Sequence, residues 1–289
     1  MTSPQVQVVW EAGCLLGEGP VWLADRAELR FVDIKAGRVL SYVPATGETA
    51  VAETGGNPSF IVPETGGGLL VGSRNTIHRF DGERLGAVVT AIPEAASNRT
   101  NDATVDDLGR LWFGTMHDPE SEPSGAVWCL DRGHLHQAGP SAVVTNGPAI
   151  SKDNRFLYHV DSGQRTIWRY PLGPSPTLDH GEVFLTLGED DGYPDGVVVD
   201  AEDCLWVALW DGWAVRRYTP DGTLLLHVPM PCARPTKIAF GGADLMTAFV
   251  TSARVGLSEA DLAEQSLAGS LFAFTAPAPG RPLPAVRLD

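Results

Sequence analysis

Short apolar stretches and turn residues alternate along almost the whole chain, and the pattern repeats. Each copy begins with a polar motif that contains a turn residue or proline. An apolar strand follows, and then further short strands rich in β-branched and aromatic residues. Helical periodicity is absent over most of the chain. The first strands of six copies are predicted at residues 17–22, 56–61, 100–105, 145–150, 194–199 and 235–240.

The spacing of this repeat indicates the architecture. Equivalent polar residues of successive copies lie 39 to 49 residues apart, and a four-stranded propeller blade takes roughly 40 to 50 residues. We therefore predict an all-β chain that forms a six-bladed β-propeller, as a single domain over residues 1–289. The equivalent positions are Glu18, Asn57, Asn101, Asn146, Asp195 and Thr236.

The two ends of the chain are predicted to close the ring. An open ring would leave unpaired strand edges, and residues 6–10 form an apolar strand that belongs to no repeat. We expect this strand to pair beside the last blade. Residues 258–265 are typical of a short helix, and the proline-rich residues 276–284 of an irregular segment over the surface.

The charge of the chain excludes some classes of partner. The formal net charge is −15, and such a surface repels nucleic acid and anionic membranes. No apolar run reaches the roughly 18 residues needed to span a bilayer, and no targeting segment is visible. The four cysteines form no Cys-x-x-Cys motif, which is typical of a reduced, cytoplasmic protein. No protein partner is indicated.

The equivalent positions should meet around the central channel, because the first strand of each propeller blade lines it. Two carboxylates and three carboxamides would then share a channel in which unpaired polar groups are costly. A hard cation such as Ca²⁺, Mg²⁺ or Mn²⁺ would satisfy these oxygen ligands. The alternative is a wet channel in which the polar groups bond only to each other and to water, and the ring alone leaves both interpretations open.

Five short motifs carry a resemblance to a known family. They are LGEGP at residues 16–20, NRTND at 98–102, GTM at 114–116, TNGP at 145–148 and YPDG at 193–196. In order and spacing they resemble the signature motifs of the gluconolactonase/regucalcin (senescence marker protein) family. The resemblance implies a six-bladed propeller, one divalent metal ion in the channel, and hydrolysis of aldonolactones.

The resemblance also implies roles for individual residues. Carried over by position, the metal ligands are Glu18, Asn146 and Asp195, and the substrate-binding pair is Arg99 and Asn101. Calcium is favoured by ligand type, and ferrous iron, zinc, manganese and magnesium stay open, since the metal varies within the family.

One loop departs from the family pattern. After Gly-Thr-Met the family often has an acidic pair, whereas this chain has His117 and Asp118. This form is similar to bacterial xylonolactonases and arabinonolactonases, which favours xylonolactone or a related pentonolactone as substrate. We expect both residues to line the substrate pocket, and Asn57 to reach the substrate or a metal-bound water.

The expected chemistry needs a polarised lactone carbonyl, a delivered water and a stabilised oxyanion. Asp195 is the expected base: it would bind the metal through one carboxylate oxygen and accept a proton from water with the other. The alternative is that Asp195 is only a ligand. A nucleophilic serine is not expected, because no Gly-x-Ser-x-Gly motif occurs. The competing functions are a non-catalytic calcium-binding propeller and a paraoxonase-like hydrolase of other lactones or esters.

Overall fold

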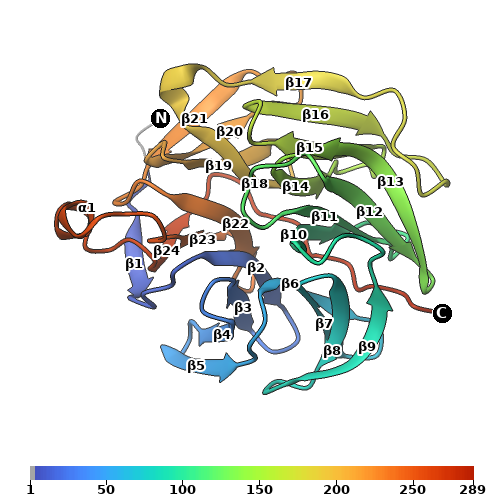
Figure 1. Cartoon of the computed structure of the whole chain (residues 1–289). Coiled ribbons are helices and arrows are strands. Elements are labelled where there is room, and N and C mark those ends of the chain that lie inside the picture. The colour runs from blue at the N-terminus through green and yellow to red at the C-terminus, as the bar shows by residue number, and fades with distance from the viewer. Residues whose placement is uncertain (1–3) are drawn as a thin grey trace.

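The computed structural model describes residues 4–289, and in this part of the chain six four-stranded antiparallel sheets form the fold. The sheets are the blades of a propeller. Their first strands, β2, β6, β10, β14, β18 and β22, gather at the centre (Figure 1) and each contacts the next around a closed ring. The predicted six-bladed all-β fold is therefore confirmed. The predicted single domain over 1–289 includes residues 1–3, which lie outside the described residues.

The blades follow one another along the chain, and each is built from the centre outwards. Blade 1 contains β2 (Gly17–Leu23), β3 (Glu28–Asp33), β4 (Arg38–Val43) and β5 (Glu48–Glu53). Blade 2 contains β6 (Pro58–Glu64), β7 (Gly68–Ser73), β8 (Thr76–Phe80) and β9 (Leu85–Ala91). Blade 3 contains β10 (Asn98–Val105), β11 (Leu111–His117), β12 (Gly125–Asp131) and β13 (His134–Ala142).

The second half of the ring repeats this order. Blade 4 contains β14 (Thr145–Ile150), β15 (Phe156–Asp161), β16 (Thr166–Pro171) and β17 (Glu182–Thr186). A short 3₁₀ helix, η1 (Glu189–Asp191), leads into blade 5. Blade 5 contains β18 (Tyr193–Val199), β19 (Leu205–Trp210), β20 (Ala214–Tyr218) and β21 (Leu224–Pro229). Blade 6 contains β22 (Pro235–Gly241), β23 (Thr247–Ser252), β24 (Leu271–Thr275) and β1 (Gln7–Trp10).

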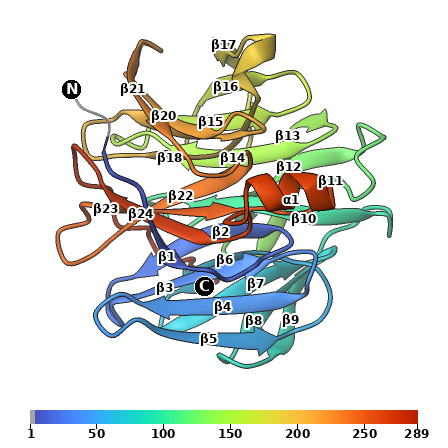
Figure 2. The ribbon, with the colours of Figure 1, turned by 90° about the vertical axis from the view of Figure 1, so that its left-hand side faces the viewer.

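Blade 6 closes the ring with strands from both ends of the chain. Strand β1 runs antiparallel to β24, with Gln7 opposite Ala273 and Val8 opposite Phe272 (Figure 2). The predicted pairing of the N-terminal strand beside the last blade is thus confirmed. The predicted helix is also present as α1 (Glu259–Glu264), and Ser258 caps its N-terminus by accepting a hydrogen bond from the Asp261 amide.

The core lies between neighbouring blades rather than within one. Outer strands are mostly exposed, whereas the first three strands of each blade bury alternate apolar side chains against the next blade. Trp206 of blade 5, for example, packs edge-to-face on Phe240 of blade 6. No helix within residues 4–289 is long and apolar enough to cross a membrane.

The C-terminal segment corrects one expectation. Residues 276–284 contain no helix or strand, as predicted, but they do not simply run over the surface. Ala276 and Ala278 are buried, and residues 281–285 line a cavity of about 630 Å³ at one end of the channel. The segment is retained there because its apolar side chains cover apolar first-strand residues that would otherwise contact water.

Candidate active site

The six first strands place one residue each at the same position of the ring. In every blade the pairing of the first strand with the second breaks register at this point, which is the behaviour of a β-bulge. One residue of each blade lies at this break, either as the last paired residue before it or as the first unpaired residue within it. The residues at this position are Glu18, Ser59, Asn101, Asn146, Asp195 and Thr236.

Blade 2 differs from the prediction, because Ser59 and not Asn57 occupies its ring position. Asn57 lies before β6, and Pro58 is the residue that pairs with the end of the second strand. In blade 4 a glycine separates Asn146 from the proline that follows, but in blade 2 the proline follows Asn57 directly, so aligning the two asparagines shifts the register by two residues. The Ser59 hydroxyl shares a 2.6 Å hydrogen bond with the Thr100 hydroxyl.

Five of the predicted site residues line one cavity of about 390 Å³ at the end of the channel where the first strands begin. Lys35, Glu120, Ser162, Tyr193 and Trp210 also contribute to its wall. The larger cavity of about 630 Å³ lies below the ring, is mainly apolar and contains none of the ring carboxylates. The chemistry therefore belongs to the smaller cavity. The predicted residues that line it are Glu18, Arg99, Asn101, Asn146 and Asp195.

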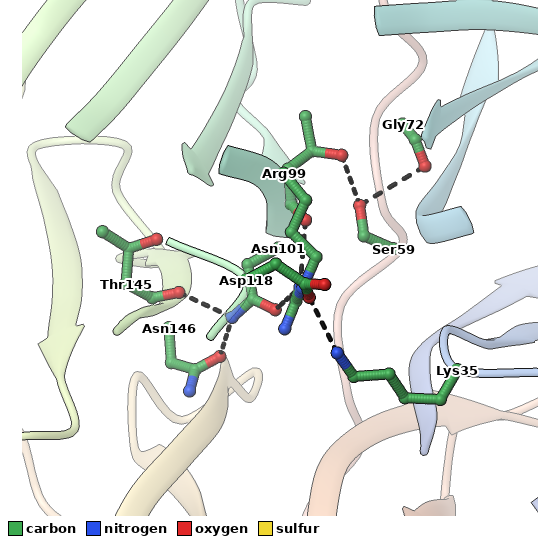
Figure 3. A network of polar contacts seen from close by, with 9 residues as sticks. Lys35, Ser59, Gly72, Arg99, Asn101, Asp118, Thr145 and Asn146 are labelled. Atoms are coloured by element: carbon green, nitrogen blue, oxygen red, sulfur yellow. Dashed lines mark hydrogen bonds and ion pairs between the residues drawn. The ribbon is translucent and has the colours of Figure 1, made fainter. Parts of the chain in front are cut away.

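A chain of hydrogen bonds orients the polar side chains of this cavity (Figure 3). Arg99 donates through Nε to Asp118 at 2.7 Å and through Nη1 to the Asn101 carboxamide oxygen at 2.6 Å. Asn101 in turn donates to the Asn146 carboxamide oxygen at 2.7 Å. This oxygen keeps a second lone pair, because a carbonyl oxygen can accept twice. Arg99 Nη2 takes part in none of these bonds.

The two residues after Gly-Thr-Met differ in position. Asp118 accepts hydrogen bonds from both Lys35 and Arg99 at 2.7 Å, and Figure 3 shows the two cationic side chains converging on it. Burial alone would raise the pKa of Asp118, but the bonds to Lys35 and Arg99 outweigh it and lower the pKa. His117 is buried and bonds to Ser121. Neither His117 nor Asp118 forms part of the wall of this cavity, and their contact with substrate stays a prediction.

Within residues 4–289, the carboxylates of the ring are buried and form no ion pair. Glu18 and Asp195 are 6% and 5% exposed. Burial and the nearby Asp102 raise the pKa of Glu18 to about 8. Burial, Glu18 and Asp102 also raise the pKa of Asp195 well above its ordinary value. Two ionised carboxylates in this cavity are therefore unfavourable unless a cation binds there.

This donor set fits a divalent cation. Glu18, Asn146 and Asp195 offer oxygen atoms alone, and two carboxylates match the charge of one divalent ion. Among residues 4–289 no group of three or more His, Cys, Asp or Glu side chains is arranged to hold a metal. These three side chains instead combine two carboxylates with one carboxamide, and such a set suits a hard cation that accepts amide oxygen.

Two functional-site residues could not be recognised as partners from the sequence. Lys237 donates to Asp102 and, at 3.2 Å, to the Ala103 carbonyl oxygen, and both charged residues are buried. Each directly follows a ring residue, Thr236 or Asn101. The sequence signals were a lysine in the mostly apolar first strand of blade 6 and an aspartate in the polar motif of blade 3, and nothing in the spacing shows that the two residues meet.

The glycines of the motifs make room for this arrangement. A Cβ atom on Gly196 would lie 2.5 Å from Cβ and Cγ of Lys237, so only glycine lets the lysine stem pass. Gly19 has a φ of +54°, and an added Cβ would lie 3.2 Å from Cα of Phe60. Close approach of neighbouring first strands therefore accounts for glycine at these positions.

With this geometry established, comparison with known proteins identifies the family. Residues 16–254 match the SMP-30/gluconolactonase/LRE-like region, and the chain belongs to this family. The chain is 34% identical over 270 residues to 6-deoxy-6-sulfogluconolactonase of Pseudomonas putida, covering 92% of this chain and 93% of that protein. It is 33% identical over 283 residues to pentonolactonase XacC of Haloferax volcanii, covering 95% of each.

The fold agrees with solved structures of the family. Regucalcin from Agrobacterium tumefaciens, described as a calcium-binding protein, superposes with a TM-score of 0.93 at 26% identity and covers 100% of both chains. The family resemblance of the five motifs is thus confirmed. All eight residues predicted for the site lie within the matched residues 16–254.

Proposed function

We propose that this protein hydrolyses sugar lactones to aldonic acids with one divalent cation held by Glu18, Asn146 and Asp195. The observation that carries this proposal is the pairing of two buried carboxylates with a carboxamide in the same cavity as Arg99 and Asn101. The relatives named as a sulfogluconolactonase and a pentonolactonase support the reaction class. The regucalcin relative, named as calcium-binding, supports a divalent ion.

The cation, when bound, would polarise the lactone carbonyl and offset the charge of the oxyanion. Asp195 would bind the cation with one carboxylate oxygen and would accept the proton of the attacking water with the other. Asn146 is oriented for its ligand role by donating to the Ser162 hydroxyl at 3.0 Å.

Substrate binding falls to the hydrogen-bonding wall beside the carboxylates. Asp118 and Asn101 hold the Arg99 guanidinium so that its remaining amino group is directed to sugar oxygens. Met116, Tyr193 and Trp210 supply apolar surface for the less polar faces of the sugar ring. This wall, with the Gly-Thr-Met-His-Asp form of the loop, favours xylonolactone or a related pentonolactone as the preferred substrate.

The protein acts on small molecules in the cytoplasm, in line with four unpaired and buried cysteines. The whole chain, residues 1–289, acts as one domain.

The test is hydrolysis of xylono-, arabinono- and gluconolactone followed by pH-stat, with protein stripped of metal and then reloaded with Ca²⁺, Fe²⁺, Zn²⁺, Mn²⁺ or Mg²⁺. Wild-type protein should lose turnover on stripping and recover it with one of these ions. Asp195→Asn should lower the rate by about 10²- to 10⁴-fold, the typical contribution of a positioned base. Asp190→Asn, an exposed aspartate close in sequence, is the matched control.

Two results would contradict the proposal. Full turnover in correctly folded Asp195→Asn would show that Asp195 is neither the base nor an essential metal ligand. Stoichiometric binding of calcium with no turnover of any lactone would support a non-catalytic calcium-binding protein instead.

A further inference from the structure

A buried ion pair crosses the central channel directly below the ring of site residues. Lys237 belongs to β22 of blade 6 and Asp102 to β10 of blade 3, and these two blades face each other across the six-membered ring. The ammonium group of Lys237 bonds to Asp102 Oδ1 and to the Ala103 carbonyl oxygen. Lys237 also lines the larger cavity, whereas neither residue of the pair lines the smaller one.

Asp102 is close enough to the ring carboxylates to act on them electrostatically. Its charge raises the pKa of both Glu18 and Asp195, whereas the charge of Lys237 lowers both. The Lys237 stem lies against Gly196, the residue after Asp195. The four ionisable groups therefore form one electrostatic unit in a buried environment, where charges interact far more strongly than in water.

The net charge of these four groups matches the charge of one divalent ion. When all four groups are ionised, Glu18, Asp195 and Asp102 contribute three negative charges and Lys237 contributes one positive charge. The net charge of two negatives matches one divalent ion. Without the ammonium group, one divalent ion would leave an uncompensated buried negative charge, which is strongly unfavourable.

Asp102 also has an oxygen that no protein group satisfies. Its Oδ2 atom is buried and has no hydrogen-bond partner, although the residue is only 2% exposed. Oδ1 of the same carboxylate and the Ala103 carbonyl oxygen are the two oxygen atoms that accept from the ammonium group. Oxygen donors of this kind are the ligands that hard cations prefer.

We propose that Lys237 is a built-in cation that occupies a second cation position in the channel and thereby limits the site to one divalent ion. This inference rests on the proposed function in one respect only, namely that a metal binds at Glu18, Asn146 and Asp195. Removal of the ammonium group should open the second position, with Asp102 as its charged ligand. A lysine that merely fills space would have no effect on the number of ions bound.

The experiment measures metal stoichiometry and not activity. Metal-stripped wild type, Lys237→Met and the double variant Asp102→Asn/Lys237→Met are titrated with Mn²⁺ by calorimetry, and free Mn²⁺ is counted in parallel by its paramagnetic resonance signal. Methionine keeps the length and apolar character of the lysine stem, and the double variant restores the net charge of two negatives.

The expected stoichiometries are one Mn²⁺ per chain for wild type, two for Lys237→Met, and one again for the double variant. A single ion of unchanged affinity in Lys237→Met would overturn the inference, and so would the absence of Mn²⁺ binding by wild type. One ion in wild type and two in Lys237→Met, with no hydrolysis of any lactone, would leave the inference standing and remove only the proposed reaction.

If Lys237→Met does not fold, the single variant Asp102→Asn provides a second test. Asp102→Asn leaves the ammonium group without its counter-charge beside the divalent site, so Mn²⁺ affinity should fall by about tenfold or more through charge repulsion. The exposed Asp190→Asn is the control. Wild-type affinity in Asp102→Asn would show that the pair does not act on the site and would overturn the inference.

Discussion

Two kinds of buried aspartate occur in this protein, and their surroundings are opposite. Asp106 and Asp200 lie in equivalent turns after the first strands of blades 3 and 5, and both are fully buried. Asp106 accepts hydrogen bonds from two backbone amides, from Arg110 Nε at 2.6 Å and from Trp112 Nε1 at 2.8 Å.

Asp200 repeats this arrangement. It accepts from two amides, from Trp206 Nε1 at 2.9 Å and from Arg217 Nε at 2.7 Å. The protein itself satisfies these carboxylates of the blades, which therefore have no unmet need for a ligand.

The channel carboxylates are left incomplete. Glu18 accepts a bond from the amide of Gly19, and Asp102 keeps one oxygen without a partner. Burial raises the pKa of Glu18, Asp195 and Asp102, and repulsion from neighbouring carboxylates adds to this rise for Glu18 and Asp195. A buried carboxylate is thus structural where the protein completes its hydrogen bonds, and suited to bind a cation where the protein withholds them.

The largest effect is expected from breaking a completed carboxylate. Asp106→Asn should lower the free energy of unfolding by about 3–5 kcal/mol, because it leaves the buried Arg110 guanidinium without its counter-charge. Urea unfolding followed by fluorescence measures this. Folded variant protein should still bind Mn²⁺ as wild type does, and a stability loss below about 1 kcal/mol would contradict the comparison.

Crowding the channel should have the next largest effect. Gly196→Ala places a Cβ atom against the Lys237 stem, so the variant should lose about 1–3 kcal/mol of stability through overpacking. Gly173→Ala is the control, because an added Cβ there meets no atom within 4 Å. Equal unfolding midpoints for the two variants would show that the channel has more room than the structure indicates.

Glu18→Gln should raise the free energy of unfolding, whereas Asp106→Asn should lower it. The folded-state pKa of Glu18, about 8 against an ordinary 4.5, means that this group favours folding below pH 4.5 and loses that contribution as the pH rises towards 8. Metal-free Glu18→Gln should therefore be more stable than wild type at pH 8 by at least about 1 kcal/mol, since each unit of pKa difference corresponds to about 1.4 kcal/mol. The difference should vanish near pH 4.5.

Thermal unfolding across this pH range measures the effect, with and without Mn²⁺. Added Mn²⁺ should stabilise wild type and leave Glu18→Gln almost unchanged, since the variant lacks a charged ligand. A Glu18→Gln protein that is less stable than metal-free wild type at pH 8 would contradict the proposed cost of burying the ionised Glu18 carboxylate.

The smallest effect is expected at the edge of the cavity. Asp118 is a half-exposed acceptor for Lys35 and Arg99, so Asp118→Asn should change stability by less than about 1 kcal/mol. Loss of the orienting charge on Arg99 should raise KM about threefold to tenfold with little change in kcat, if Arg99 binds substrate. Lys35→Met, which keeps the Arg99–Asp118 pair, should leave KM nearer to the wild-type value.

The sequence was most informative where local rules decide the structure. Turn residues, strand patterns and the spacing of polar first-strand residues predict six blades, and the spare apolar strand at residues 6–10 predicts ring closure. The ring position was predicted in five blades. It failed in blade 2 because the register depends on how the bulge places Ser59 relative to Pro58, and spacing alone does not reveal this.

The sequence was least informative where residues from opposite blades meet. Lys237 and Asp102 are 135 residues apart, and nothing in either strand identifies the other residue as its partner. For the same reason, the sequence does not predict that Glu120 and Lys35 contribute to the cavity wall. Such contacts depend on the three-dimensional closure of the ring, whereas the motifs record only its repeating unit.

Ring closure by β1 has a consequence for how the chain is made. Among the strands of the ring, β1 is synthesised first and its partner β24 last. Five blades can assemble from local strands during synthesis, but the sixth must wait, with β1 unpaired throughout. A nascent chain stopped before residue 271 would keep a free strand edge, and this makes late truncation the step most exposed to aggregation.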